Sequence, residues 1–159
     1  PTEERTFLEL FQAVADSPKP AVVAFQEIGG HADYSAHSGE IMATAFSRLG
    51  AVGLVTDGGV RDVPEVRNLK FHYFARGTVV SHAHFKIVRV GVPVQILGLE
   101  IKPGDLLHGD ENGLMTVPAA ALDGLEAAVE QVRARERRLL DFLRSPDFTV
   151  AKLKGRFIE

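Results

Sequence analysis

The sequence predicts a mixed α/β domain that ends in a long helix. A strand–helix–strand pattern occupies residues 20–60, and short apolar segments separated by turn sequences fill residues 71–117. A helical stripe of apolar side chains follows, from residue 122 to 143. The 159 residues include 45% hydrophobic and 25% charged side chains, which is ordinary for a domain with its own core. Because there is no internal repeat and no evident linker, we expect residues 1–159 to form a single domain.

The first half of the chain predicts two helices and two strands. Apolar residues line one face of the first helix and two prolines end it: Phe7, Leu8, Leu10, Phe11, Val14, Pro18 and Pro20. Residues 21–25 read as a buried strand. Ser38 can cap a second helix that Gly50 ends, and residues 51–56 form a strand before a turn at 57–59. A unit of this kind favours parallel pairing of its two strands.

The second half predicts short strands and then one helix. The expected strands cover residues 71–75, 85–90, 93–97, 106–107 and 114–117. The segments 103–105 and 110–113 are turn sequences, and the second of them closes a hairpin. The final helix carries one apolar stripe before Pro146 stops it: Leu122, Leu125, Val129, Val132, Leu139 and Leu143.

Composition excludes several classes of protein. The formal net charge of −3 argues against a broad nucleic-acid-binding surface. The absence of cysteine excludes disulfides, thiolate metal sites and a cysteine nucleophile, and it fits a reducing compartment. No apolar run is long enough to span a bilayer, and no secretory signal opens the chain. We therefore expect a cytoplasmic protein that binds neither nucleic acid nor membrane.

The stretch Gly39-Glu40-Ile41-Met42 is a candidate anion site. The start of a helix exposes unpaired backbone amides and the positive end of the helix dipole. Gly39 removes a side chain that would block a ligand, so the amides of these four residues could hold a carboxylate. Taken alone, a loop glycine before an ordinary helix is the better interpretation.

A charged group follows the next strand. The guanidinium of Arg61 suits a carboxylate, or a carbonyl oxygen that becomes an enolate. Asp62 offers an oxygen ligand to Mg²⁺ or a similar hard cation, and Glu40 and Glu65 could orient the water around that ion. For an isolated Arg–Asp pair, a salt-bridge cluster on a surface loop would be the simpler explanation.

The spacing of these residues is more specific than any one of them. Twenty residues separate Glu40 from Arg61-Asp62, and two residues separate Asp62 from Glu65. This pattern resembles the RraA-like family, which includes metal-dependent 4-hydroxy-4-methyl-2-oxoglutarate/4-carboxy-4-hydroxy-2-oxoadipate aldolases. Glu40 stands where that pattern usually has Asp. Four further segments look like family segments: 74–78, 92–94, 102–105 and 109–118.

The resemblance implies a fold, an assembly and a chemistry. The fold would be a swivelling ββα-type sandwich with a C-terminal helix, in a homotrimer or a dimer of trimers. Most of the family's N-terminal segment would be missing from this chain. The implied catalytic residues are Glu40, Arg61, Asp62 and Glu65. Asp62 would hold Mg²⁺ or Mn²⁺, and residues 39–42 with Arg61 would bind the substrate.

Two functional hypotheses follow from the resemblance. The first is a divalent-metal-dependent lyase that cleaves 2-oxo acids such as 4-hydroxy-4-methyl-2-oxoglutarate to pyruvate, with oxaloacetate decarboxylase activity as a companion. The second is a protein-binding regulator of a ribonuclease without catalysis. A family member that acts on another small acid is a third possibility.

Other polar motifs suggest a histidine metal site, a phosphate loop or a serine nucleophile, but each of these interpretations is weaker. His82-Ala83-His84 could bind a metal on a strand, but we interpret it as a structural pair, or one that orients other ligands, rather than as a primary metal site. His31 and His37 could border the pocket, but we expect them first to face solvent. Gly58-Gly59 lacks the residues of a phosphate loop. No nucleophile elbow surrounds any serine, so a serine hydrolase is not expected.

Overall fold

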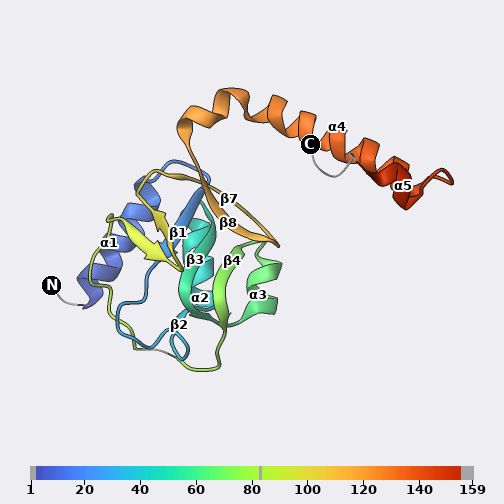
Figure 1. Ribbon diagram of the computed structural model, residues 1–159. Helices are drawn as coiled ribbons and strands as arrows, with labels where there is room; N and C mark the ends of the chain where they lie inside the picture. The colour runs from blue at the N-terminus through green and yellow to red at the C-terminus, as the bar shows by residue number, and fades with distance from the viewer. Residues whose placement is uncertain (1–2, 83, 155–159) are drawn as a thin grey trace. The chain divides into compact units, whose positions relative to one another are not determined.

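The computed structural model describes residues 3–82 and 84–154 of the chain (Figure 1). Its elements, in order, are α1 (Glu3–Asp16), β1 (Ala21–Phe25), β2 (Ala36–Ser38), α2 (Glu40–Arg48), β3 (Ala51–Val60), α3 (Val63–Asn68), β4 (His72–Thr78), β5 (Val94–Ile96), β6 (Leu99–Ile101), β7 (Leu106–Asp110), β8 (Gly113–Val117), a 3₁₀ turn η1 (Ala119–Ala121), α4 (Leu122–Arg144) and α5 (Val150–Leu153). The chain divides at Val117 into two compact units, which are described separately.

A four-stranded parallel sheet organises the first unit, with β3 at its centre. Strand β4 pairs along one edge of β3. On the other edge, β1 pairs with residues 51–56 and β2 with Gly59 and Val60. Strands β2 and β3 therefore end next to each other, and the residues that follow them meet at one edge of the sheet.

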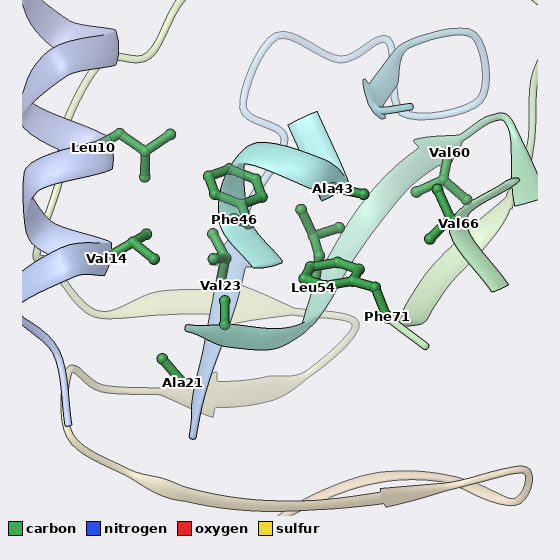
Figure 2. Close-up of a cluster of buried hydrophobic side chains, with 11 residues drawn as sticks. Leu10, Val14, Ala21, Val23, Ala43, Phe46, Leu54, Val60, Val66 and Phe71 are labelled. Carbon is green, nitrogen blue, oxygen red and sulfur yellow. The ribbon is translucent and has the colours of Figure 1, made fainter. Parts of the chain in front are cut away.

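The larger core lies between the sheet and the helices. Figure 2 shows Leu10 and Val14 of α1 facing Phe46 of α2 and Val23 of β1. Val66 of α3 completes this side of the core. Phe46, Leu54 and Val66 are almost fully buried, as expected for a helix layer that covers a parallel sheet.

Two antiparallel hairpins cover the opposite side of the sheet. Val55, Ile96 and Ile101 form a second buried cluster there, to which β5–β6 and β7–β8 both contribute. Because successive residues of a strand point to opposite faces, Leu54 enters the first core and Val55 the second. Both faces of β3 are thus covered, which explains why its sequence is almost continuously apolar.

Several predicted elements are confirmed. The first helix, the strand at 21–25 and its parallel pairing with the strand that begins at Ala51 are all present. Strands β7 and β8 form the predicted hairpin. The helix after Gly39 ends as expected, since Gly50 has a φ of 87° and can adopt the left-handed conformation that closes a helix.

Three local predictions are wrong. Residues 57–59 continue β3 instead of turning, because Gly59 pairs with Ala36 of β2 and with Gly77 of β4. Residues 85–90 form no strand; Ile87 and Val90 pack on the helix-side core without a pairing partner. Ser38 does not cap α2, because Gly39 is the N-cap residue and the hydroxyl of Ser38 is bonded elsewhere.

The second unit contains the predicted C-terminal helix, α4, followed by α5. No residue of α4 is buried, and four residues of its apolar stripe are exposed: Leu122, Leu125, Val129 and Val132. Among the described residues, no helix combines the length and apolar character that a membrane span requires.

Candidate active site

The candidate site forms where β2 and β3 end. The amide of Arg61 donates to the carbonyl oxygen of Ser38 at 3.0 Å, which joins the two strand ends directly. Gly39 and Glu40 follow Ser38, and Asp62 follows Arg61. Residues that are more than 20 positions apart in sequence are therefore neighbours in space, as the predicted motif requires.

Asp62 is held in an unusual conformation at the centre of this site. Its φ and ψ are 57° and 38°, in the left-handed region that non-glycine residues rarely adopt. Its Oδ2 accepts a hydrogen bond from the amide of Glu40 at 2.9 Å and lies 3.6 Å from the Nε of Arg61. Strained backbone that the surrounding structure enforces is characteristic of functional sites.

Gly39 is required for this arrangement. A Cβ atom at position 39 would lie 2.4 Å from Oδ2 of Asp62 and 2.9 Å from Nε of Arg61. The sequence predicted that the missing side chain leaves room for a ligand. In the structure, that room admits the two charged side chains of the site itself.

The start of α2 also has amides with no partner inside the helix. The first bond of the helix runs from the amide of Ala43 to the carbonyl of Gly39 at 3.0 Å, so the amides of Ile41 and Met42 precede it. The amide of Glu40 is already used by Asp62. Among the described residues the amides of Ile41 and Met42 have no acceptor, so these two of the predicted carboxylate-binding amides are available to an anion.

An open pocket of about 450 Å³ lies over Arg61 and Asp62. Its other walls come from the start of α3 and from the end of β4: Val63, Pro64, Thr78, Val79 and Val80. The side chains of Arg61 and Asp62 are 34% and 36% exposed, so both can reach a ligand in the pocket.

The two remaining motif residues are present but less constrained. Glu40 begins α2 and Glu65 lies in the first turn of α3, and both are exposed. Within the described part of the chain, neither carboxylate has a hydrogen bond or an ion pair. Both are therefore free to orient water or to accept a proton.

Sequence reasoning missed Tyr73 of β4. Its hydroxyl donates to Oγ of Ser38 at 2.9 Å and lies 3.3 Å from the carbonyl oxygen of Gly39. Burial raises the pKa of Tyr73, and the negative charge of Asp62 raises it further, against the opposing effect of the Ser38 hydrogen bond. This tyrosine stands between His72 and Phe74 in a short strand, and no motif distinguished it from a core residue.

The donor set suits a hard divalent cation bound through one carboxylate. One oxygen of Asp62 is committed to the Glu40 amide, and no bond of the other oxygen is found among the residues that the structure describes. The same residues contain no group of three His, Asp or Glu side chains arranged to hold a metal. Mg²⁺ commonly binds through one or two carboxylates and keeps several waters, so Asp62 fits it.

The histidines lie elsewhere. His31 is exposed, as predicted, but His37 is 4% exposed, so the prediction that it faces solvent is wrong. Both line a separate cavity of about 650 Å³ beside β1. His82 and His84 are exposed with ring centroids 5.8 Å apart, and Ala83 between them lies outside the described residues. Glu27 and His37 line the larger cavity, but they are hydrogen-bonded to each other, and His37 is also bonded to Thr56. We therefore place the candidate site at Arg61.

Comparison with known proteins identifies the family. The RraA-like family, described as Aldolase/RraA, matches residues 2–116. The chain belongs to the RraA-like family. Structures of RraA proteins share its fold: RraAS2 from Streptomyces coelicolor, described as an unusual member of the RNase ES inhibitor RraA family, superposes with a TM-score of 0.67 at 26% identity. That match covers 87% of this chain and 69% of the other.

Relatives in sequence carry an aldolase name. A 4-hydroxy-4-methyl-2-oxoglutarate aldolase of Thermus thermophilus is 31% identical over 110 residues, which cover 69% of this chain and 66% of the relative. A Halalkalibacterium halodurans protein with a provisional form of that name is 32% identical over 109 residues, or 65% of this chain. The match spans about half of that relative, 52% of its length.

Proposed function

We propose that this protein is a divalent-metal-dependent carbon–carbon lyase that acts on a pyruvate-derived 2-oxo acid. The observation that carries the proposal is the convergence of Arg61 and Asp62 over Gly39, at the start of α2. Aldolase-named relatives at 31–32% identity support the same chemistry. The preferred substrate would resemble 4-hydroxy-4-methyl-2-oxoglutarate.

The site residues have distinct roles in this proposal. The amides of Ile41 and Met42 bind the substrate carboxylate next to the 2-oxo group. Asp62 would hold Mg²⁺ or Mn²⁺, and the ion would act as a Lewis acid toward the 2-oxo oxygen. Arg61 donates hydrogen bonds to that oxygen as it gains negative charge, and a donor placed in this way stabilises the transition state more than the substrate.

Cleavage also requires a base for the hydroxyl group at C4. Removal of that proton forms a carbonyl at C4, breaks the C3–C4 bond and leaves the electron pair in a pyruvate enolate, which is then protonated at C3. The exposed carboxylate of Glu40 or Glu65, acting through water, is our candidate for this proton transfer. Oxaloacetate decarboxylation passes through the same enolate, so we expect it as a second activity.

The test follows pyruvate release from 4-hydroxy-4-methyl-2-oxoglutarate and from oxaloacetate. Release should require Mg²⁺ or Mn²⁺, stop on addition of EDTA and be lost in Asp62→Ala while the protein stays folded. Asp105→Ala is a matched control, because Asp105 lies in a turn where it accepts the amide of Lys102. A folded, metal-supplied protein that releases no pyruvate from either substrate would refute the proposal.

We further propose that the protein works in the cytoplasm as a homotrimer or a dimer of trimers. The exposed apolar stripe of α4 is compatible with an assembly. Sedimentation of the purified chain at several concentrations would measure the assembly directly. A monomer that retains turnover would contradict it.

One observation favours a second candidate function. RraA proteins described as inhibitors of RNA processing share the fold, including one from Thermus with a TM-score of 0.58 at 27% identity. The alternative is therefore a regulator that binds a ribonuclease without catalysis. Stoichiometric binding to a ribonuclease together with no lyase turnover would favour it over the lyase.

A further inference from the structure

The hydrogen bonds of His37 connect three strands near the candidate site. His37 lies in β2, with its Nε2 at 2.8 Å from Oε2 of Glu27 and its Nδ1 at 2.7 Å from Oγ1 of Thr56. Glu27 follows β1 and Thr56 belongs to β3. The imidazole therefore joins the end of β1 to β2 and β3, with only 4% of the residue exposed.

Glu27 and Thr56, the two partners of His37, are themselves held by hydrogen bonds from backbone amides. Oε1 of Glu27 accepts from the amide of Gly29 at 2.5 Å, and Oγ1 of Thr56 accepts from the amide of Gly58 at 3.0 Å. Burial raises the pKa of Glu27, but the hydrogen bonds from His37 and Gly29 outweigh it, and the net pKa is lowered. An ionised Glu27 can only accept, so Nε2–H of His37 donates to it. Both ring nitrogens are thus engaged, Nε2 with Glu27 and Nδ1 with Oγ1 of Thr56.

Packing allows the ring only one position. A Cβ atom at Gly58 would lie 2.5 Å from Cε1 of His37, so the imidazole rests directly on the glycine backbone. The rings of Phe25 and Phe85 lie 6.2 Å and 5.6 Å from it, between centroids. With both nitrogens bonded and its face covered, His37 cannot rotate without breaking several contacts at once.

His37 also occupies the irregular position of β2. Ala36 pairs with Gly59 and Ser38 pairs with Val60, so His37 is the extra residue of a bulge. A bulge re-aims the residues that follow it. Here these are Ser38, which accepts the Arg61 amide, and Gly39, which contacts the side chains of Arg61 and Asp62.

We propose that His37 is a positioning residue for the lyase site. Its bonds to Glu27 and Thr56 fix the bulge in β2, and the bulge sets where Gly39 and the free amides of α2 lie relative to Arg61. His37 itself touches neither substrate nor metal. This inference rests on the proposed function, because the geometry that His37 fixes is that of the carboxylate-binding and enolate-stabilising groups.

The test compares two histidine variants. His37→Phe keeps an aromatic ring in the same packing but removes both hydrogen bonds. His31→Phe makes the same change at an exposed histidine nearby. We expect His37→Phe to raise KM about tenfold and to lower kcat less, because the carboxylate-binding amides at the start of α2 are displaced. We expect wild-type values for His31→Phe.

This pattern separates positioning from partial unfolding. Loss of folded protein lowers the apparent kcat in proportion and leaves KM unchanged, whereas a displaced carboxylate site changes KM. Glu27→Gln keeps a hydrogen-bonding group of the same shape and should stay within about threefold of the wild-type KM. Wild-type kcat and KM in a folded His37→Phe protein would overturn the proposal.

A second variant and a spectroscopic measurement also test the role of His37. Where His37→Phe does not fold, Thr56→Val removes the Nδ1 partner without changing side-chain shape, and a wild-type KM in that variant would overturn the proposal. Backbone amide chemical shifts of Gly39 and Glu40 provide a readout without turnover: they should move in Thr56→Val or His37→Phe and not in His31→Phe. If the wild type releases no pyruvate, the proposed function fails, and these shifts alone decide whether His37 positions the loop.

Discussion

Two polar clusters on strands β2 and β3 and on the segments next to them differ in how much of their bonding capacity is used. The site cluster (Glu40, Arg61, Asp62 and Glu65) is partly exposed, and two of its carboxylates have no bond to the described residues. The interior cluster (Glu27, His37 and Thr56) is largely buried, and its polar atoms are paired. Chemistry requires groups that can still bind a ligand, and a scaffold requires groups that cannot, so the first cluster is the candidate site.

The Arg61→Ala substitution should have the largest effect on turnover and tests whether the site cluster carries the chemistry. Removal of the guanidinium should lower kcat for pyruvate release by about 10²–10³-fold, because a preorganised donor to the developing oxyanion is lost. The melting temperature should change little, since the side chain is 34% exposed. Steady-state kinetics alongside thermal unfolding would check both expectations. Near-wild-type turnover would move the chemistry away from this cluster.

The next effect concerns the close approach at Gly39. In Gly39→Ala the new methyl group would start 2.4 Å from Oδ2 of Asp62, so the carboxylate must move. A displacement of about 1 Å within a catalytic constellation can cost on the order of 10²-fold in rate, and we expect a loss of tenfold to that value. Gly77→Ala is the matched control, since a Cβ at Gly77 has no neighbour within 4 Å. Equal activities of the two variants would contradict this account.

The same change at Gly58 probes the interior cluster and should affect stability. The methyl group of Gly58→Ala would overlap the imidazole of His37, with 2.5 Å between Cβ and Cε1. Overpacking a filled interior site typically costs about 1–3 kcal/mol, so the free energy of unfolding should fall by that amount. Denaturant unfolding would measure it, again with Gly77→Ala as the control. A loss below about 0.5 kcal/mol would mean that the ring relocates easily.

The structure brings together Arg61, Asp62 and the start of α2, as the sequence predicted, but it buries His37, which the sequence placed in solvent. The difference has a physical reason. Glu40 comes just after β2, and Arg61 and Asp62 come just after β3. Because β2 and β3 pair side by side, this spacing along the chain brings the three residues together. The pairing of Glu27 with Thr56 through His37 depends on a bulge and on a glycine beneath the ring, which no periodicity reports. Sequence analysis therefore placed His37 in solvent and interpreted Gly58 as part of a turn.

The fold also contains elements that the sequence predicted and features that it did not. Apolar periodicity predicted α1, β1 and α4 and the parallel pairing of β1 with β3. The prediction of a strand at 85–90 was wrong because alternate apolar residues also occur in an extended segment that packs without pairing. Tyr73 was missed because its role depends on which residue lies opposite its hydroxyl.

The smallest predicted effect is the pH dependence that Glu27 contributes. Its pKa in the folded state is lowered from the ordinary value of 4.5, although burial acts in the opposite direction, because His37 and the Gly29 amide donate to the carboxylate. A lowered folded-state pKa contributes stability that is fully present above the unfolded pKa and is lost as the pH falls through the folded pKa. The difference in unfolding free energy between wild type and Glu27→Gln should thus be constant from pH 7 to about pH 5.5 and shrink below about pH 4.5. Urea unfolding at pH 7, 5.5, 4.5 and 3.5 would measure this difference. A difference that stays constant down to pH 3.5 would show that ionisation of Glu27 does not stabilise the folded state.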